Sequence, residues 1–169
     1  MKTVNYRGVL VVFQIPEHWA EEYQPEGGGA FYDPDDASVT LRLNVTTVEA
    51  PRDLRVSDAA SVLRETGVSI LGRIETLPNG QAIAVGEVVH ATERGTAIEL
   101  HPILVARVVP PRTVRIANFV TTAVPSESQA AIIAPKLGAI HEWVRACTIS
   151  DAAPQSQAPP SLWRRMLGR

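Results

Sequence analysis

Strict alternation of apolar and polar residues over positions 38–46 constrains the fold of this chain more than any other feature. Every second residue is apolar and the residues between are polar or charged, the apolar positions being Val39, Leu41, Leu43 and Val45. Because successive side chains of a β-strand point to opposite faces of a sheet, this alternation predicts a strand with one buried face. Such a strand needs neighbouring strands, and its apolar face needs a cover.

Other segments carry the strand signals of a largely antiparallel sheet. The predicted strands lie at 6–15, 29–33, 38–49, 69–76, 82–91, 97–109 and 113–124. The turn at 77–81 is the most specific, because Pro78 presets φ and Asn79-Gly80 accepts a positive φ. Short turns of this kind join antiparallel neighbours, so we expect a sheet of about six or seven strands.

A short helix is predicted near 58–66, between the third and fourth of these strands. Ser57 is the expected N-cap, Val62 and Leu63 are expected on the inner face, and Gly67 is the expected stop signal. A helix this short depends on burial against the sheet for its stability.

A long C-terminal helix is predicted near 127–148. Ser126 and Gln129 stand at the spacing of a capping box. Pro135 should kink this helix or lie in the first turn of its second segment. Apolar residues then recur at steps of three and four, as on one face of a helix: Ile133, Leu137, Ile140, Val144 and Cys147. Helices and strands together predict an α+β fold.

The pattern stops after Ile149, which predicts one domain at 1–150. The polar, proline-rich linker SDAAPQSQAPPS leads to the basic amphipathic end LWRRMLGR, and we expect residues 151–169 to be disordered. A disordered amphipathic end is suited to folding upon binding.

Charge and composition narrow the classes of partner and location. The net charge is −2, so no basic field attracts nucleic acid. No apolar run approaches the roughly 18 residues of a membrane-spanning helix, and residues 9–13 are followed by Pro16 rather than by a cleavage site. The single cysteine, Cys147, forms no internal disulfide. We therefore expect a cytoplasmic protein without stable membrane insertion.

The stretch IPEHWAEEYQPEGGGAFYDPDD, residues 15–36, looks most like a chemical site. Gly27-Gly28-Gly29 lacks the Lys-Ser/Thr pair and the following helix of a phosphate loop. The DPDD sequence at 33–36 has a proline in its second place, and no glutamate closes it as in a calcium loop. Both segments are predicted to be turns that reverse the chain.

No catalytic, cofactor-binding or metal-binding residues are predicted. His141-Glu142 lacks a second histidine four residues later, since position 145 is arginine. Cys147 lies on the core stripe, where cysteine is usually an inert small hydrophobe. Glu87 and Glu99 could face each other across neighbouring strands, although solvated strand faces explain them more simply. We expect a protein that is not an enzyme and holds no cofactor.

Two groups of residues are predicted as a partner surface. The first is the aromatic edge formed by Trp19, Tyr23, Phe31 and Tyr32, with the alternative that Trp19 and Phe31 cap the end of the core. The second is the basic amphipathic end LWRRMLGR, which we call the tail, with the alternative that it is simply a disordered end. Its apolar residues would dock on a partner while its arginines assist: Leu162, Trp163, Met166, Leu167, Arg164, Arg165 and Arg169.

The order of these elements resembles the Mog/PsbP-like superfamily, which includes the Ran-binding Mog protein, PsbP, bacterial DcrB-type proteins and type VI secretion accessory proteins. The resemblance covers residues 5–150, through the pieces FQIPEHW (13–19), GGGAFYDPDDASVTLRL (27–43), LPNGQAIAVGE (77–87) and HEWVRACTI (141–149). It implies an α/β/α sandwich on an antiparallel sheet. It implies binding of other proteins, without shared catalytic residues.

Three functions follow as hypotheses. The first is a non-enzymatic domain that binds another protein, as an adaptor, chaperone or secretion accessory, with a homodimer left open. The alternative is a small-ligand-binding protein with a pocket between the sheet and a helix, where Gly86, His90, His101 and Asn118 would supply polar contacts. The third is an enzyme, which would require titratable groups gathered in a cleft.

Overall fold

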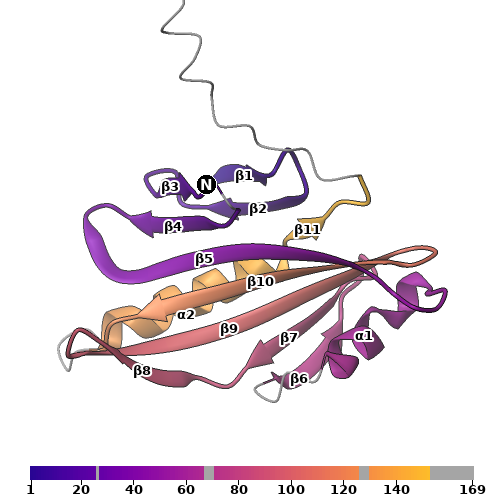
Figure 1. Ribbon diagram of the computed structural model, residues 1–169. Helices are drawn as coiled ribbons and strands as arrows, with labels where there is room; N and C mark the ends of the chain where they lie inside the picture. Colours follow the sequence, from indigo (N-terminus) through magenta and orange to yellow (C-terminus); the bar gives the residue numbers. More distant parts are fainter. Residues whose placement is uncertain (26, 67–70, 126–129, 153–169) are drawn as a thin grey trace, which may run out of the picture.

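The computed structural model describes residues 1–25, 27–66, 71–125 and 130–152, and it shows an α+β fold dominated by antiparallel strands (Figure 1). The helical elements are a 3-10 turn η1 (Val56–Asp58), α1 (Ala59–Glu65) and α2 (Ala130–Arg145). The strands of the described residues are β1 (Lys2–Tyr6), β2 (Val11–Ile15), β3 (Ala20–Tyr23), β4 (Gly29–Asp33), β5 (Asp36–Glu49), β6 (Leu71–Thr76), β7 (Ala82–Gly86), β8 (Val89–Glu93), β9 (Thr96–Val109), β10 (Thr113–Ala123) and β11 (Thr148–Ile149).

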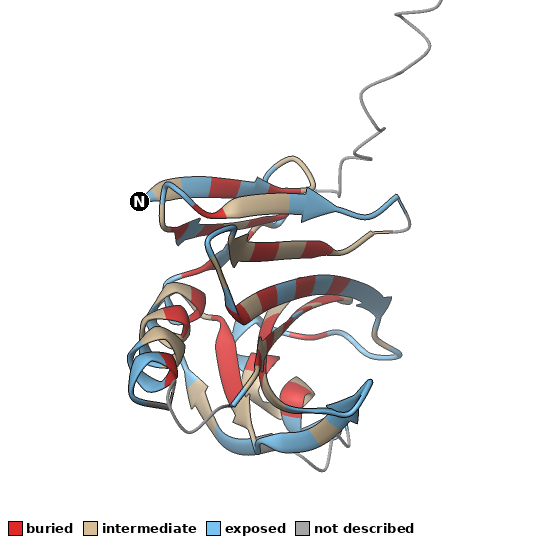
Figure 2. Ribbon diagram, turned by 90° about the vertical axis from the view of Figure 1, so that its left-hand side faces the viewer, coloured by how far each residue is buried: buried red, intermediate tan, exposed pale blue. Residues whose placement is uncertain are grey.

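The main sheet has eight strands in the order β3-β4-β5-β10-β9-β7-β6, with β8 paired to β9. Neighbouring strands pair antiparallel throughout, as the turn signals predict. The alternating segment forms β5, along which buried and exposed residues alternate (Figure 2). Leu41 and Leu43 are buried and Arg42 is exposed. Its pairing with β10 runs from Val39 opposite Ala123 to Glu49 opposite Thr113.

A second sheet, in the order β1-β2-β11, was not predicted. The single strand expected at 6–15 is wrong, because the chain reverses between β1 and β2. Arg7, Gly8 and Val9 all adopt positive φ, a conformation that only Gly8 among them adopts readily. The strand expected at 82–91 is likewise divided into β7 and β8. The prediction of about six or seven strands is therefore too low.

One face of the main sheet carries α2 and the small sheet. Their apolar side chains form one buried cluster with those of β4, β5, β9 and β10. Phe13 of β2 lies at its centre, with edge-to-face contacts to Phe31 at 5.0 Å and to Phe119 at 5.5 Å between ring centroids. The aromatic contacts join the two sheets across this face.

The opposite face of the main sheet carries α1. Ile83 belongs to the α2 cluster, whereas its neighbours Ala82 and Ala84 belong to a second cluster with Leu63 of α1. Because adjacent strand residues point to opposite faces, the two clusters lie on opposite sides of the sheet. A helix therefore packs on each face, and Figure 1 shows α1 beside β6 and β7, away from α2.

The first predicted helix is confirmed as α1, but its start differs. A 3-10 turn precedes it and Arg55, not Ser57, is the N-cap residue of that turn. The Asp58 carboxylate accepts a hydrogen bond from the Arg55 backbone N–H at 2.8 Å. Asp58, rather than Ser57, therefore supplies the polar side chain at the start of this helical segment. Leu63 is fully buried and Val62 packs on the same cluster, as predicted. Gly67 lies outside the described residues.

The predicted C-terminal helix is shown in part, over Ala130–Arg145. Ser126 and Gln129 lie outside the described residues, and Pro135 lies inside the helix. The predicted end near 148 is wrong because Thr148–Ile149 forms β11. The apolar stripe is confirmed for its members inside the helix: Leu137 is partly buried, and Ile133, Ile140 and Val144 are buried. Cys147 is also buried, but it follows the end of α2, so its predicted place on the helical stripe is wrong. Neither described helix has the length and hydropathy needed to cross a bilayer.

The residues that follow α2 are held against the rest of the domain by hydrogen bonds and an ion pair. The Gln81 side chain donates to the Cys147 carbonyl at 3.0 Å and accepts the Ile149 backbone N–H at 2.6 Å. The Arg107 guanidinium binds both carboxylate oxygens of Asp151, which holds the pKa of Asp151 below its usual value. Arg115 is buried and donates to the Ser150 carbonyl. The predicted tail residues Leu162, Trp163, Arg164 and Arg165 lie outside the described residues.

Candidate functional site

The stretch at 15–36 contains both predicted turns: the glycines join β3 to β4 in a hairpin, and the turn at 33–36 joins β4 to β5, as expected for strands at 29–33 and 38–49. The strand β3 itself was not predicted. Gly27 and Gly28 adopt φ of +101° and +118°, so they supply the backbone conformation of the turn. The Gly28 backbone N–H donates to the Tyr6 hydroxyl at 2.8 Å, which ties this turn to β1. In the second turn, the Asp35 N–H donates to the Asp33 carboxylate at 3.0 Å.

The aromatic residues of this hairpin divide between core and surface. Trp19 is only 5% exposed and stands edge-to-face on Trp143 of α2 at 5.4 Å. Phe31 is fully buried. Both residues therefore cap the core, whereas Tyr23 is 42% exposed and Tyr32 is partly exposed. In the described part of the chain, Tyr23 and Tyr32 are the members of the predicted partner surface that reach solvent.

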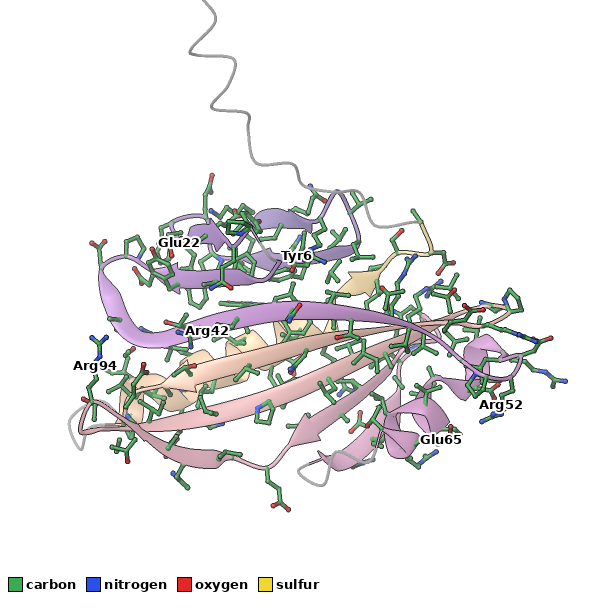
Figure 3. All side chains as sticks on the ribbon, viewed as in Figure 1. Tyr6, Glu22, Arg42, Arg52, Glu65 and Arg94 are labelled. Carbon is green, nitrogen blue, oxygen red and sulfur yellow. The ribbon has the colours of Figure 1, made fainter. Side chains whose placement is uncertain are left out.

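Glutamate carboxylates on β3 accept hydrogen bonds from both tyrosine hydroxyls. The Tyr23 hydroxyl donates to Glu21 at 2.6 Å, and the Tyr32 hydroxyl donates to Glu22. Burial and the hydrogen bond to Glu21 raise the pKa of Tyr23, and the hydrogen bond to Glu22 raises that of Tyr32. Glu22 and Tyr6 lie at this end of the molecule, far from Arg52 and Glu65 beside α1 (Figure 3).

A pocket of about 200 Å³ lies between α2 and the main sheet. Strands β7, β9 and β10 form its floor, and α2 forms one wall. Its apolar lining comes from Val85, Val88, Ile103 and Leu137, and its remaining lining residues are Gly86, His101, Thr121, Gly138 and His141. We call this cavity the α2 pocket.

Three polar side chains from three elements line the α2 pocket. His101 of β9 and Thr121 of β10 are paired directly across the sheet. His101 Nε2 lies 3.2 Å from a carboxylate oxygen of Glu99, two residues along the same face. His141 of α2 has a buried Nε2 that makes no hydrogen bond to any described residue. The arrangement can bind a small molecule through an apolar wall and a few hydrogen bonds.

The residues predicted for a ligand pocket are only partly brought together. Gly86 and His101 line the α2 pocket, as the alternative hypothesis expected. His90 is largely exposed and lies 3.9 Å from Glu99, outside the lining. Asn118 is exposed, and its neighbour Phe119 points to the α2 side, so Asn118 faces away. Glu99 faces His90 across the ladder rather than Glu87.

From the sequence, His141 was considered as a metal-ligand candidate and was not assigned to a pocket. The adjacent stripe residue Ile140 was the available signal, because it places His141 next to the buried side of α2. Thr121 and Gly138 were missed. Their role depends on which strands lie opposite α2, and the spacing of residues in the chain does not determine that.

Other chemical candidates are structural. Burial raises the pKa of the Cys147 thiol to about 12, so this thiol is protonated at neutral pH. Within the ranges that the structure describes, no three His, Cys, Asp or Glu side chains gather in a way that could hold a metal ion.

Comparison with known proteins shows the fold. No family model matches the chain, and no curated protein matches it in sequence. A Bacteroides thetaiotaomicron VPI-5482 structure matches with TM-score 0.58 and 17% identity, over 88% of this chain and 48% of that one. This chain thus spans about half the length of that protein.

Two further solved structures are similar at lower identity. LpqN, involved in cell envelope biogenesis of Mycobacterium tuberculosis, matches with TM-score 0.50 and 12% identity, over 83% of each chain. The Mog1 E65A mutant matches with TM-score 0.47 and 12% identity, over 88% of this chain and 95% of that one. At these identities the structures with TM-scores of 0.50 and 0.58 show a similar fold and nothing beyond the fold.

Proposed function

We propose that this chain, whose fold is Mog/PsbP-like, is a non-enzymatic domain that binds another protein, as an adaptor, chaperone or secretion accessory. The observation that supports this most is the edge of β3, where two tyrosines reach solvent with their hydroxyls already hydrogen-bonded. Tyrosine is enriched in protein interfaces because it offers apolar area and a polar tip.

The β3 edge has the features of a binding surface for an extended segment. Within the described residues β3 pairs with β4 alone, so its outer edge presents unpaired backbone donors and acceptors. The carboxylates of Glu21 and Glu22 restrict the tyrosine side chains before a partner arrives, which reduces the entropy lost on binding. A partner strand added at this edge would gain main-chain hydrogen bonds.

Charge indicates the kind of segment that fits this edge. Glu21, Glu22, Asp33 and Asp35 lie on or beside the hairpin, and Lys2 forms an ion pair with Glu21 at 3.1 Å. We therefore propose a partner segment that carries lysine or arginine. The tail residues Leu162, Trp163, Arg164 and Arg165 remain a second proposed contact. Truncation after residue 152 tests them without removing Asp151, which binds Arg107.

The β3 surface is tested by photocrosslinking from position 32, identification of the crosslinked protein, and titration of that protein against purified variants. The double substitution Tyr23→Ser with Tyr32→Ser is expected to weaken binding about tenfold or more. Val48→Ser is the matched control, because Val48 is a similarly exposed apolar residue, 45% exposed, on β5. Equal affinities for the double variant and the control would contradict the proposal.

The second candidate function is binding of a small ligand in the α2 pocket. The buried, unpaired Nε2 of His141 favours it, because a buried polar atom without a partner destabilises a protein unless something satisfies it. Soaking or titration with small molecules, followed by amide chemical shifts of Ile103 and Gly138, tests this candidate. Absence of any shift at these positions across a fragment collection would contradict it.

A further inference from the structure

Helix α2 carries a glycine at the mouth of the α2 pocket, and packing does not explain it. A Cβ added at Gly138 would meet no described atom within 4 Å, so no neighbour requires a glycine there. Its φ is not positive either, so alanine would fit the backbone. Glycine destabilises a helix interior relative to alanine. Gly138 is exposed where it borders the pocket, so a larger side chain there would reach the pocket mouth without displacing packed atoms.

The wall next to Gly138 contains an unsatisfied hydrogen-bonding atom. His141 follows Gly138 by three residues, so the two lie on neighbouring parts of the same helix side. His141 lines the cavity, and its Nε2 is buried and has no hydrogen-bond partner among the described residues. A ligand atom that comes within reach of this nitrogen would satisfy it.

The floor of the pocket supplies two more polar groups and one nearby negative charge. Thr121 is 1% exposed, and its register partner His101 stands beside it. The Glu99 carboxylate lies 3.2 Å from His101 Nε2, which orients the imidazole and puts a negative charge at this end. A ligand anion would be repelled there, whereas a hydroxyl group can donate to one neighbour and accept from another.

We propose that the α2 pocket binds a small, uncharged, mostly apolar molecule that carries one hydroxyl group. The hydroxyl would lie between His141, His101 and Thr121, and the apolar body would contact Val85, Val88, Ile103 and Leu137. A dry apolar cavity of roughly 150 Å³ accommodates benzene, so about 200 Å³ has room for a ring with a polar substituent. The inference rests on the second candidate function and is independent of the β3 surface.

The test uses three probes of one shape, titrated into the full-length chain and followed by amide chemical shifts. They are 4-methylphenol, toluene and 4-methylbenzoate. We expect 4-methylphenol to bind at the pocket and toluene to bind about threefold to tenfold more weakly, because it lacks the hydrogen-bonding group. We expect 4-methylbenzoate to bind most weakly. If 4-methylbenzoate bound most tightly, the pocket would still be a ligand site, but the proposal that its ligand is uncharged and carries a hydroxyl group would be contradicted.

Two variants localise the binding. Gly138→Leu should abolish 4-methylphenol binding, and Ala131→Leu, at an exposed position on the same helix, should leave it unchanged. His141→Phe keeps a ring of similar shape and should remove the preference for 4-methylphenol over toluene. Thermal unfolding confirms that each variant is folded.

Three results would overturn the inference: no binding of 4-methylphenol to the folded chain, equal binding by Gly138→Leu and Ala131→Leu, or an unchanged preference in His141→Phe. Failure of the ligand titration is distinguishable from failure of the protein-binding proposal, which the Tyr23 and Tyr32 variants test separately. Glu99→Gln gives a further readout, because removing the negative charge should improve binding of 4-methylbenzoate.

Discussion

The two faces of the main sheet are covered by helices in different ways. Under α1 the sheet presents three fully buried alanines, Ala82, Ala84 and Ala106, beside larger residues such as Leu104. Under α2 and the small sheet it presents the large Phe119 and Ile103, and then the polar His101 and Thr121. Among the described residues, the alanines are packed beneath α1, whereas His101 and Thr121 border a pocket beneath α2.

The largest expected effect concerns the aromatic contacts that join the small sheet to the main sheet. Phe119 is fully buried and meets Phe13 edge-to-face. Phe119→Ala should lower the free energy of unfolding by about 3–5 kcal/mol, through lost burial and the cavity left behind. Urea denaturation measures this loss. A change below about 1 kcal/mol would mean that the α2 side is not a packed core around this ring.

The next effect concerns the polar link that closes the chain after α2. Gln81 is fully buried and satisfies both the Cys147 carbonyl and the Ile149 N–H. Gln81→Leu keeps the volume but leaves two buried backbone groups unpaired, at a cost of about 2–4 kcal/mol. Hydrogen exchange of the Ile149 amide should accelerate in parallel. Unchanged protection of that amide would contradict the role given to Gln81.

A smaller effect, an increase in the free energy of unfolding, is expected from a substitution at the pocket mouth. Gly138→Ala should stabilise the protein by about 0.5–1 kcal/mol, because alanine favours the helix and meets open space. Gly95 is a matched control, since its added Cβ would also meet nothing within 4 Å, but its φ is +83°. Gly95→Ala should therefore destabilise. Thermal denaturation of both variants separates the helix effect from the effect of space alone.

The smallest effect is electrostatic and depends on pH. Lys136 of α2 forms an ion pair with Asp36, at the start of β5, and hydrogen bonds from Lys136 and Ser38 lower the pKa of Asp36 from 3.8 to about 2. Since the folded-state pKa is depressed, the stabilisation is present above about pH 4 and is lost as pH falls through 2.

Lys136→Met tests this ion pair. It should cost less than about 1 kcal/mol near neutral pH, because both side chains are about 30% exposed. The difference from the parent protein should vanish towards pH 2. Arg52→Met, which breaks a pair with both side chains more than half exposed, is the control and should change little. A difference for Lys136→Met that grows as pH falls would contradict the assignment.

The sequence predicted those parts of the fold that local patterns encode. Alternation identified β5, turn residues separated most of the antiparallel strands, and the apolar stripe identified the buried side of α2. The small sheet escaped prediction because Gly8 is the one local signal of this reversal, and its neighbours Arg7 and Val9 take a positive φ that such residues rarely adopt.

The candidate sites were predictable to a smaller extent. Tyr23 and Tyr32 were recognised from composition, but the burial of Trp19 depends on Trp143, more than a hundred residues away in the chain. His101 and Gly86 were assigned to a sheet–helix pocket, whereas Thr121 and Gly138 became visible only once the pairing of β9 with β10 placed them. Register across the sheet, rather than residue type, decides membership of the pocket.

The contrast between the two faces is tested most directly by introducing the same large side chain at a buried sheet position on each. The measurement is the free energy of unfolding of Thr121→Leu and of Ala106→Leu, by urea denaturation under identical conditions; both residues are almost fully buried, and Thr121 lines the α2 pocket. We predict that Ala106→Leu costs about 1–3 kcal/mol through overpacking beneath α1, whereas Thr121→Leu costs less because its added atoms enter the pocket. Equal losses for the two variants would contradict this, because they would show that α2 leaves no more room than α1.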